Sequence, residues 1–159
     1  LKENFAAFNV ELHYGKIAHH RIIAEQFLGD NLIDYKFFCF HGTPRFFYVS
    51  SDLIHDRQAK MGFFDLSGKK IPLIRNDYED IGTITPPDCF AQLVEAAKTL
   101  SADFPFVRVD FFLANSTFYF AELTFTPSAA MMSLNPASYD AEWGKLLNID
   151  ELMNQYENS

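Results

Sequence analysis

The chain has 159 residues, of which 48% are hydrophobic, and a formal net charge of −8 at pH 7. This length suits one domain with one core, and the apolar content excludes a disordered chain. The acidic balance argues against binding to a nucleic-acid backbone, and no apolar run is long enough to predict a membrane span.

The first half of the chain predicts a short helix and then strands. We expect the helix at 2–12 and a strand at 20–28, HRIIAEQFL. Strands DYKFFCF at 34–40 and RFFYVS at 45–50 flank an HGTP turn and predict a β-hairpin. The sequence MGFFDLSGKKIPL, at 61–73, predicts another strand pair around its Ser-Gly turn.

A helix is predicted next, after a polar loop. Apolar side chains recur at i, i+3, i+4, i+7 and i+10 from Phe90, which places one apolar stripe on a helix over 88–101. Two prolines end the loop, and Asp88 is placed to cap this helix or to lie in its first turn.

The end of the chain completes the predicted architecture. Residues 138–158 predict a helical tail in two pieces that meet at Asn148. No internal repeat or second domain is evident, so we expect 1–159 to form a single domain. A helix followed by a hairpin, among other antiparallel hairpins, predicts the α+β class, with an antiparallel sheet and flanking helices.

Charged residues interrupt an otherwise apolar predicted hairpin. The stretch VRVDFFLANSTFYFAELTFTP, at 107–127, consists mostly of strand-forming residues, yet it carries Arg108, Asp110 and Glu122. Charged groups in apolar β-structure are costly unless they are solvated, paired or bound to something. Because side chains alternate between the faces of a strand, Arg108 and Asp110 share one face.

The length of the hairpin loop decides whether the two acids meet. A two-residue loop pairs Asp110 with Ala121 and separates the acids. A three-residue loop pairs Asp110 with Glu122, and it also sets Arg108 opposite Thr124. Only the longer loop separates a polar face from an apolar one, so we expect the three-residue loop.

Two opposite carboxylates have Cβ atoms roughly 5 Å apart and repel each other unless a positive group lies between them. Two interpretations stay open. In the first, Arg108 forms a salt bridge with the acids on a solvated face. In the second, Asp110 and Glu122 bind a divalent cation, most simply Mg²⁺, and Arg108 contacts phosphate oxygens.

Several phrases of the sequence resemble a known enzyme family. RVDFF…FAELTFTP resembles the metal-binding hairpin of ATP-grasp enzymes, which read R-x-D, a strand turn and then E-x-N-x-x-P. DYKFFCFHG, LSADFPFVRVD and AELTFTP, in this order, resemble the TupA-like branch, which is linked to bacterial cell-surface polysaccharide synthesis. The resemblance covers residues 15–148.

The resemblance implies a set of ligands for ATP and Mg²⁺. Asp110 and Glu122 match the family's Mg²⁺ ligands, and Arg108 matches its phosphate-contacting arginine, the implied catalytic residue. Thr124 stands where many relatives have a metal-ligating Asn and is a poorer ligand.

The resemblance also implies residues that hold the nucleotide. Asp34 matches an acidic residue that contacts the ribose. Lys36 shares its face and either reaches a phosphate or is an ordinary exposed lysine. Four residues match the hinge strand, whose backbone groups bind the adenine edge: Glu25, Gln26, Phe27 and Leu28.

The activity implied by the resemblance is an ATP-dependent carboxylate–amine ligase. Its substrate would be the carboxylate or amine of a sugar or amino acid, activated through an acylphosphate. Some relatives carry glycosyltransferase labels. We expect a cytoplasmic protein, because Cys39 and Cys89 form neither a metal motif nor a disulfide framework.

The chain differs from the family pattern in one respect, and this difference favours other functions. ATP-grasp enzymes bind ATP between two subdomains, and the first supplies a phosphate-binding lysine upstream of the hinge. Only 24 residues precede Glu25, so we expect a partial domain that lacks this subdomain or needs a second chain. The alternatives are a non-catalytic nucleotide-binding remnant and, less favoured, a glycoside hydrolase that uses Asp110 and Glu122.

Overall fold

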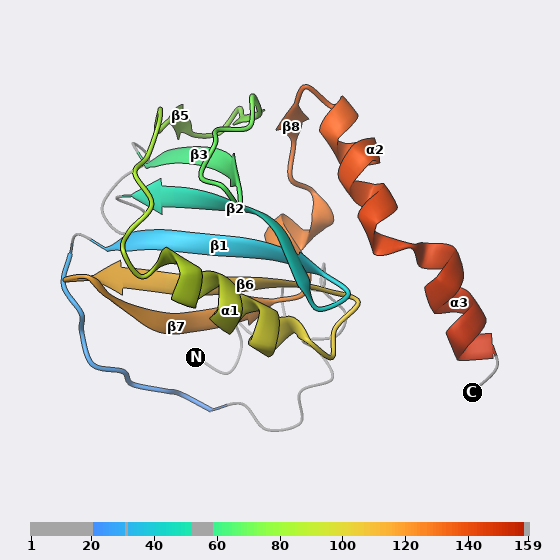
Figure 1. Cartoon of the computed structure of the whole chain (residues 1–159), viewed down its shortest axis with the longest axis horizontal. Coiled ribbons are helices and arrows are strands. Elements are labelled where there is room, and N and C mark those ends of the chain that lie inside the picture. Colours follow the sequence, from blue (N-terminus) through green and yellow to red (C-terminus); the bar gives the residue numbers. More distant parts are fainter. Residues whose placement is uncertain (1–20, 31, 52–58, 158–159) are drawn as a thin grey trace.

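The computed structural model describes residues 21–30, 32–51 and 59–157. These residues form the expected α+β fold around one large sheet (Figure 1). The strands of this sheet are β1 (Ile33–Phe40), β2 (Thr43–Ser51), β3 (Lys60–Asp65), β5 (Glu79–Asp80), β6 (Phe106–Ala114) and β7 (Thr117–Thr124). Their order is β5-β3-β2-β1-β6-β7, and all neighbours are antiparallel except the short β3–β5 pair.

Strand β1 lies at the centre of the sheet and confirms the first predicted hairpin. It pairs with β2 through a His41-Gly42 turn and with β6 on its other side. Every residue of β1 except Ile33 is buried. Because side chains alternate along the strand, this burial includes two charged residues on one face, Asp34 and Lys36.

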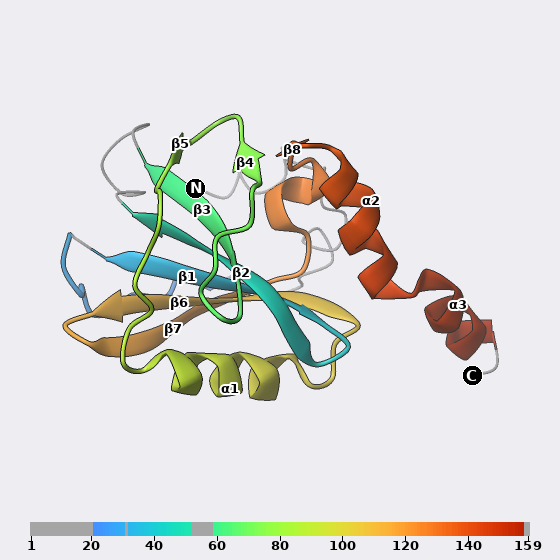
Figure 2. The ribbon, with the colours of Figure 1, turned by 45° about the horizontal axis from the view of Figure 1, so that its top comes forward.

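The two faces of the sheet are covered by different parts of the chain. Helix α1 (Phe90–Ser101) packs on one face (Figure 2), where its Leu93 and Ala97 are fully buried. The C-terminal segment, residues 127–157, covers part of the other face. Its Trp143 stacks on Phe46 with ring centroids 3.7 Å apart. The sheet is therefore apolar on the α1 face and mixed on the opposite face.

The predicted helix is confirmed, but its start is not as expected. The N-cap is Cys89, which makes no side-chain capping bond, and no acidic residue lies in the first turn. Asp88 belongs instead to the turn that leads out of the two prolines, where the Phe90 amide donates to the Pro87 carbonyl at 2.9 Å. Asp88 therefore does not cap the helix.

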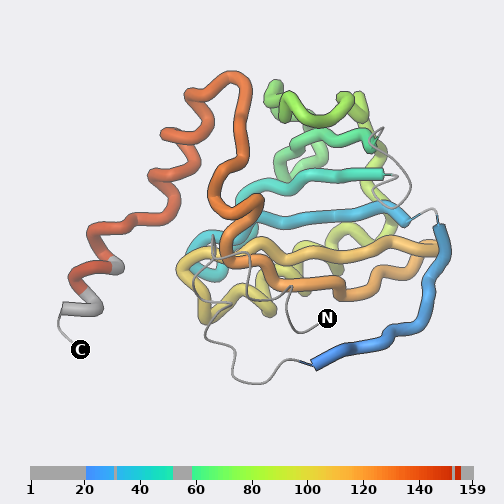
Figure 3. The backbone as a smooth tube through the Cα atoms, turned by 180° about the vertical axis from the view of Figure 1, so that it is seen from behind, coloured from blue at the N-terminus to red at the C-terminus, as the bar shows by residue number. Residues whose placement is uncertain are grey.

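The strand expected at 20–28 is wrong for the residues that the structure describes. Residues 21–28 have no regular secondary structure and run outside the sheet (Figure 3). Ile22, Ile23 and Phe27 are exposed. This segment lacks the polar–apolar alternation of a half-buried strand, and no described strand pairs with it. The helix expected at 2–12 lies outside the described residues.

The strand pair expected at 61–73 forms only in part. Strand β3 is present, but its return partner is reduced to a single bridge between Phe64 and Lys70. Further on, β4 (Ile74–Arg75) pairs with β8 (Leu134–Asn135) in a small second sheet. That pair, which the sequence did not predict, ties the loop after β3 to the C-terminal segment.

The helical tail has the expected break at Asn148. It consists of α2 (Ser138–Gly144), the 3₁₀ turn η3 (Lys145–Leu147) and α3 (Ile149–Glu157). Asn148 has a left-handed backbone, with φ of 46°, and so separates the two pieces. In the part of the chain that the structure describes, no helix has both the length and the apolarity needed to cross a bilayer.

Candidate functional site: a buried ion-pair cluster on the central strands

The turn between β6 and β7 has two residues, so the expected three-residue loop is wrong. Ala114 pairs directly with Thr117, and Asn115 and Ser116 form the turn. Both turn residues have positive φ, 49° and 63°. Two consecutive residues in this region are typical of the type I′ turn, whose twist matches that of the flanking strands.

A β-bulge nevertheless restores the pairing of the two acids. Phe111 pairs with Phe120, whereas Asp110 pairs with Glu122, so Ala121 is an extra residue on β7. The acids are opposite each other, as expected, but through the bulge and not through the loop. Because of the bulge, Phe120 lies on the α1 face beside Phe111, with ring centroids 6.5 Å apart, and not on the face of Glu122.

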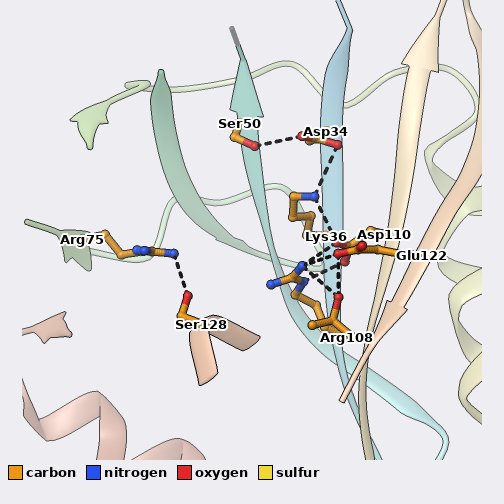
Figure 4. A network of polar contacts seen from close by, with 9 residues as sticks. Asp34, Lys36, Ser50, Arg75, Arg108, Asp110, Glu122 and Ser128 are labelled. Carbon is orange, nitrogen blue, oxygen red and sulfur yellow. Dashed lines mark hydrogen bonds and ion pairs between the residues drawn. The ribbon is translucent and has the colours of Figure 1, made fainter. Parts of the chain in front are cut away.

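Arg108 joins the two acids on this face. Its Nε and Nη2 donate to Asp110 Oδ1 and Oδ2 at 2.8 and 2.6 Å (Figure 4). Nη2 also donates to Glu122 Oε1 at 3.1 Å and to Thr124 Oγ1 at 3.0 Å. The guanidinium is therefore the positive group that two opposite carboxylates require.

Strand β1 adds a second cation to the cluster. Lys36 is opposite Asp110 in the sheet, and its Nζ donates to Asp110 Oδ2 at 3.0 Å. The same Nζ lies 3.4 Å from Asp34 Oδ1. Lys36 is only 9% exposed, so the interpretation of an ordinary exposed lysine is wrong.

The Asp34 carboxylate has fewer hydrogen bonds than the Asp110 carboxylate. Ser50 Oγ on β2 donates to Asp34 Oδ2 at 3.5 Å. Oδ1 accepts no hydrogen bond from the described residues, although Lys36 is near enough for an ion pair. Burial raises the pKa of the Asp34 carboxyl above its ordinary 3.8, and the charge of Lys36 opposes this rise only in part.

The oxygen atoms of this cluster are of the type that Mg²⁺ binds, but they are paired in this structure. Asp110, Glu122 and Thr124 offer carboxylate and hydroxyl oxygens, and Arg108 contacts all three. Among the described residues no group of three His, Cys, Asp or Glu side chains is arranged to hold a metal ion. Binding of a cation by all three oxygens therefore requires Arg108 to move.

The structure brings together six of the ten predicted site residues and leaves the hinge apart. The six on one face are Asp34, Lys36, Arg108, Asp110, Glu122 and Thr124. Residues 25–28 lie in the irregular segment outside the sheet, where Phe27 is 72% exposed.

Sequence reasoning missed three polar residues around this cluster. Tyr48 and Ser50 are opposite Lys36 and Asp34 in the β1–β2 hairpin. The predicted hairpin could have indicated both, because opposite residues share a face. Arg75 had no such signal, because its strand is only two residues long.

Comparisons with known proteins point to one family. The sequence model described as TupA-like ATPgrasp matches residues 1–148. No curated protein and no solved structure gave a significant match. The matched region includes the whole ion-pair cluster.

The buried ion pairs of Asp110 predict that Asp110→Asn, which removes its charge, is less stable than the wild type. Asp110 is fully buried between two cations, so Asp110→Asn should lower the free energy of unfolding by about 3–5 kcal/mol. The side chain of Glu122 is 59% exposed, so Glu122→Gln should lower the free energy of unfolding by at most about 1 kcal/mol. Urea denaturation measures both, and equal stability of the two variants would contradict this description.

The raised pKa of Asp34 predicts that Asp34→Asn raises the melting temperature more at neutral pH than at acidic pH. The folded state holds the Asp34 proton more tightly than the unfolded state, so this residue's contribution to stability falls as pH rises above 3.8. Asn cannot ionise, so the melting temperature of the variant minus that of the wild type should be larger at pH 7 than near pH 4. Asp103→Asn, on the exposed loop after α1, is the control. A difference that shrinks with rising pH would show that the wild-type carboxylate is well satisfied.

Proposed function

This chain belongs to the TupA-like ATP-grasp family, and from that premise we propose that the ion-pair cluster binds Mg²⁺ and the phosphates of ATP. The observation that supports the proposal most is the arrangement of Asp110, Glu122 and Arg108 on adjacent strands, with Lys36 beside them. Carboxylates for a metal ion and cations for phosphate lie on one face of the sheet.

The residues of the cluster divide into two roles. Asp110, Glu122 and Thr124 would hold Mg²⁺, which when bound neutralises the charge of the phosphates. Arg108 and Lys36 would bind phosphate oxygens, and their burial makes each contact stronger than it would be in water. Asp110 already holds both cations on this face of the sheet, Lys36 through Nζ and Arg108 through Nε and Nη2.

We propose that Arg108 turns partly away from the acids when phosphate binds. Its contact with Glu122 is exposed, and such contacts contribute at most about 1 kcal/mol, so it breaks readily. Its contact with Asp110 is buried, and the Nε bond of 2.8 Å can persist while Nη2 moves to a phosphate oxygen. Glu122 is then released to act as a metal ligand.

The reaction that fits these groups is ATP-dependent ligation of a carboxylate to an amine. The carboxylate takes the terminal phosphoryl group of ATP to give an acylphosphate and ADP, and the amine then displaces phosphate, with loss of a proton, to form an amide bond. This chain's residues would position the reactants and stabilise the charge that develops on the transferred group. A sugar or amino acid of cell-surface polysaccharide synthesis in the cytoplasm is the proposed substrate.

A second candidate is a nucleotide-binding chain without catalytic activity of its own, which assists a partner. The observation that favours it is the guanidinium of Arg108, which fills the position between the acids where a cation would bind. A glycoside hydrolase is less favoured, because Asp110 is fully buried and paired with two cations. Release of phosphate from ATP in the presence of substrate would separate the first two candidates.

The proposed metal site predicts Mg²⁺-dependent binding of ATP. In calorimetric titrations, ATP should bind the wild-type protein at least about tenfold more tightly with Mg²⁺ than with EDTA, a difference of about 1.4 kcal/mol. Glu122→Gln should remove most of this Mg²⁺ dependence while the protein stays folded. Glu95→Gln, an exposed carboxylate on α1 at the other face, should behave like the wild type. Binding that ignores Mg²⁺ would overturn the proposed site.

A further inference from the structure

Arg75 is a third cation held on the cluster's side of the sheet. Strand β4 carries it, and pairing with β8 fixes that strand beside the C-terminal segment. Its side chain is only 11% exposed. Asp77 accepts hydrogen bonds from Nε, at 2.9 Å, and from Nη2, and Cζ lies 4.8 Å from the centroid of the Tyr78 ring. These contacts hold the guanidinium in one orientation.

The remaining nitrogen of Arg75 faces the loop that follows β7. Nη1 lies 3.5 Å from Ser128 Oγ, the long limit of a hydrogen bond, while Asp77 uses the other two nitrogens. In Figure 4, Arg75 and Ser128 lie to the side of β3 and β2 that is away from Arg108, and the Arg75 guanidinium points toward the cluster. Nη1 can therefore bind an oxygen atom there without releasing Asp77.

The loop that holds Ser128 is strained. Ser128, Ala129 and Ala130 all have left-handed backbones, with φ of 53°, 54° and 60°. For residues with a side chain this conformation costs roughly 1–2 kcal/mol each, so it persists only where the surroundings impose it. Such strain is common where a loop is shaped for a ligand, and here it sets the Ser128 hydroxyl toward Arg75.

Tyr48 lies beside Arg108, and the charges of both arginines act on its phenol. It lies on β2, opposite Lys36 in the sheet, and is buried. The Cζ atom of Arg108 is 5.8 Å from its ring centroid. Burial raises the pKa of the Tyr48 phenol, while the charges of Arg108 and Arg75 both act to lower it. The phenol is therefore neutral at physiological pH and lies within electrostatic reach of both guanidinium groups.

We propose that Arg75, together with the Ser128 hydroxyl, forms a second anion contact opposite Arg108 and binds the terminal phosphate of ATP. This inference rests on the proposed function. A terminal phosphate has three free oxygens, enough for the metal ion, Arg108 and Arg75 at once, whereas each inner phosphate has two. An arginine on each side also suits the transferred group, which bears the charge that develops during transfer.

Discrimination between ATP and ADP tests this contact. With Mg²⁺ present, Arg75→Gln should weaken ATP binding about tenfold and ADP binding less than about twofold, measured by calorimetry. Arg45→Gln, an exposed arginine on β2, controls for loss of charge. Asp77→Asn removes the ion pair but keeps the guanidinium, so it should retain the preference for ATP.

The possible outcomes separate the two proposals. A wild-type protein that binds neither nucleotide would overturn the proposed function and this inference with it. The inference alone would be overturned if the wild type binds ATP but Arg75→Gln weakens the binding of ATP and ADP equally. The same holds if Arg75→Gln weakens the binding of neither nucleotide. If Arg75→Gln does not fold, Ser128→Ala decides: a loss of about threefold for ATP and none for ADP supports the contact, and an unchanged ratio contradicts it.

Discussion

The full burial of Asp110 is the constraint on which the candidate site depends. A carboxylate removed from water must be paired, and Asp110 meets this need with Arg108 on its own strand and Lys36 on the neighbouring strand. Those two contacts fix the cations over the centre of the sheet. Glu122 and Asp34 then take positions around cations whose places are already determined.

The face that carries this cluster changes character along each strand. Phe38 is two residues from Lys36 and lies on the same face of β1. Phe106 is two residues from Arg108 and lies on the same face of β6. These aromatic side chains pack with Trp143 of the C-terminal segment and border a hollow of about 360 Å³. These aromatic contacts on one side of the cluster limit the movement of the strands that carry it.

The sequence predicted which charged residues of the β6–β7 hairpin lie together better than it predicted how the hairpin arranges them. Alternation along β6 and the scarcity of charge in an apolar hairpin were enough to single out Arg108, Asp110 and Glu122. The turn was misjudged, because a two-residue turn with a bulge at Ala121 gives the same pairing as a longer loop, and no local signal distinguishes them. The burial of Lys36 depends on β6, which is far away in the sequence, and so needed the fold itself.

The central claim is that Asp110 and Glu122 share a cation after Arg108 moves to phosphate. Crystals of the wild-type protein grown with Mn²⁺ and ATP would test it through the anomalous scattering of manganese. We expect a manganese peak in contact with both carboxylates, with Arg108 Nη2 on a phosphate oxygen. A structure in which Arg108 still bridges Asp110 and Glu122, with manganese bound elsewhere, would contradict it.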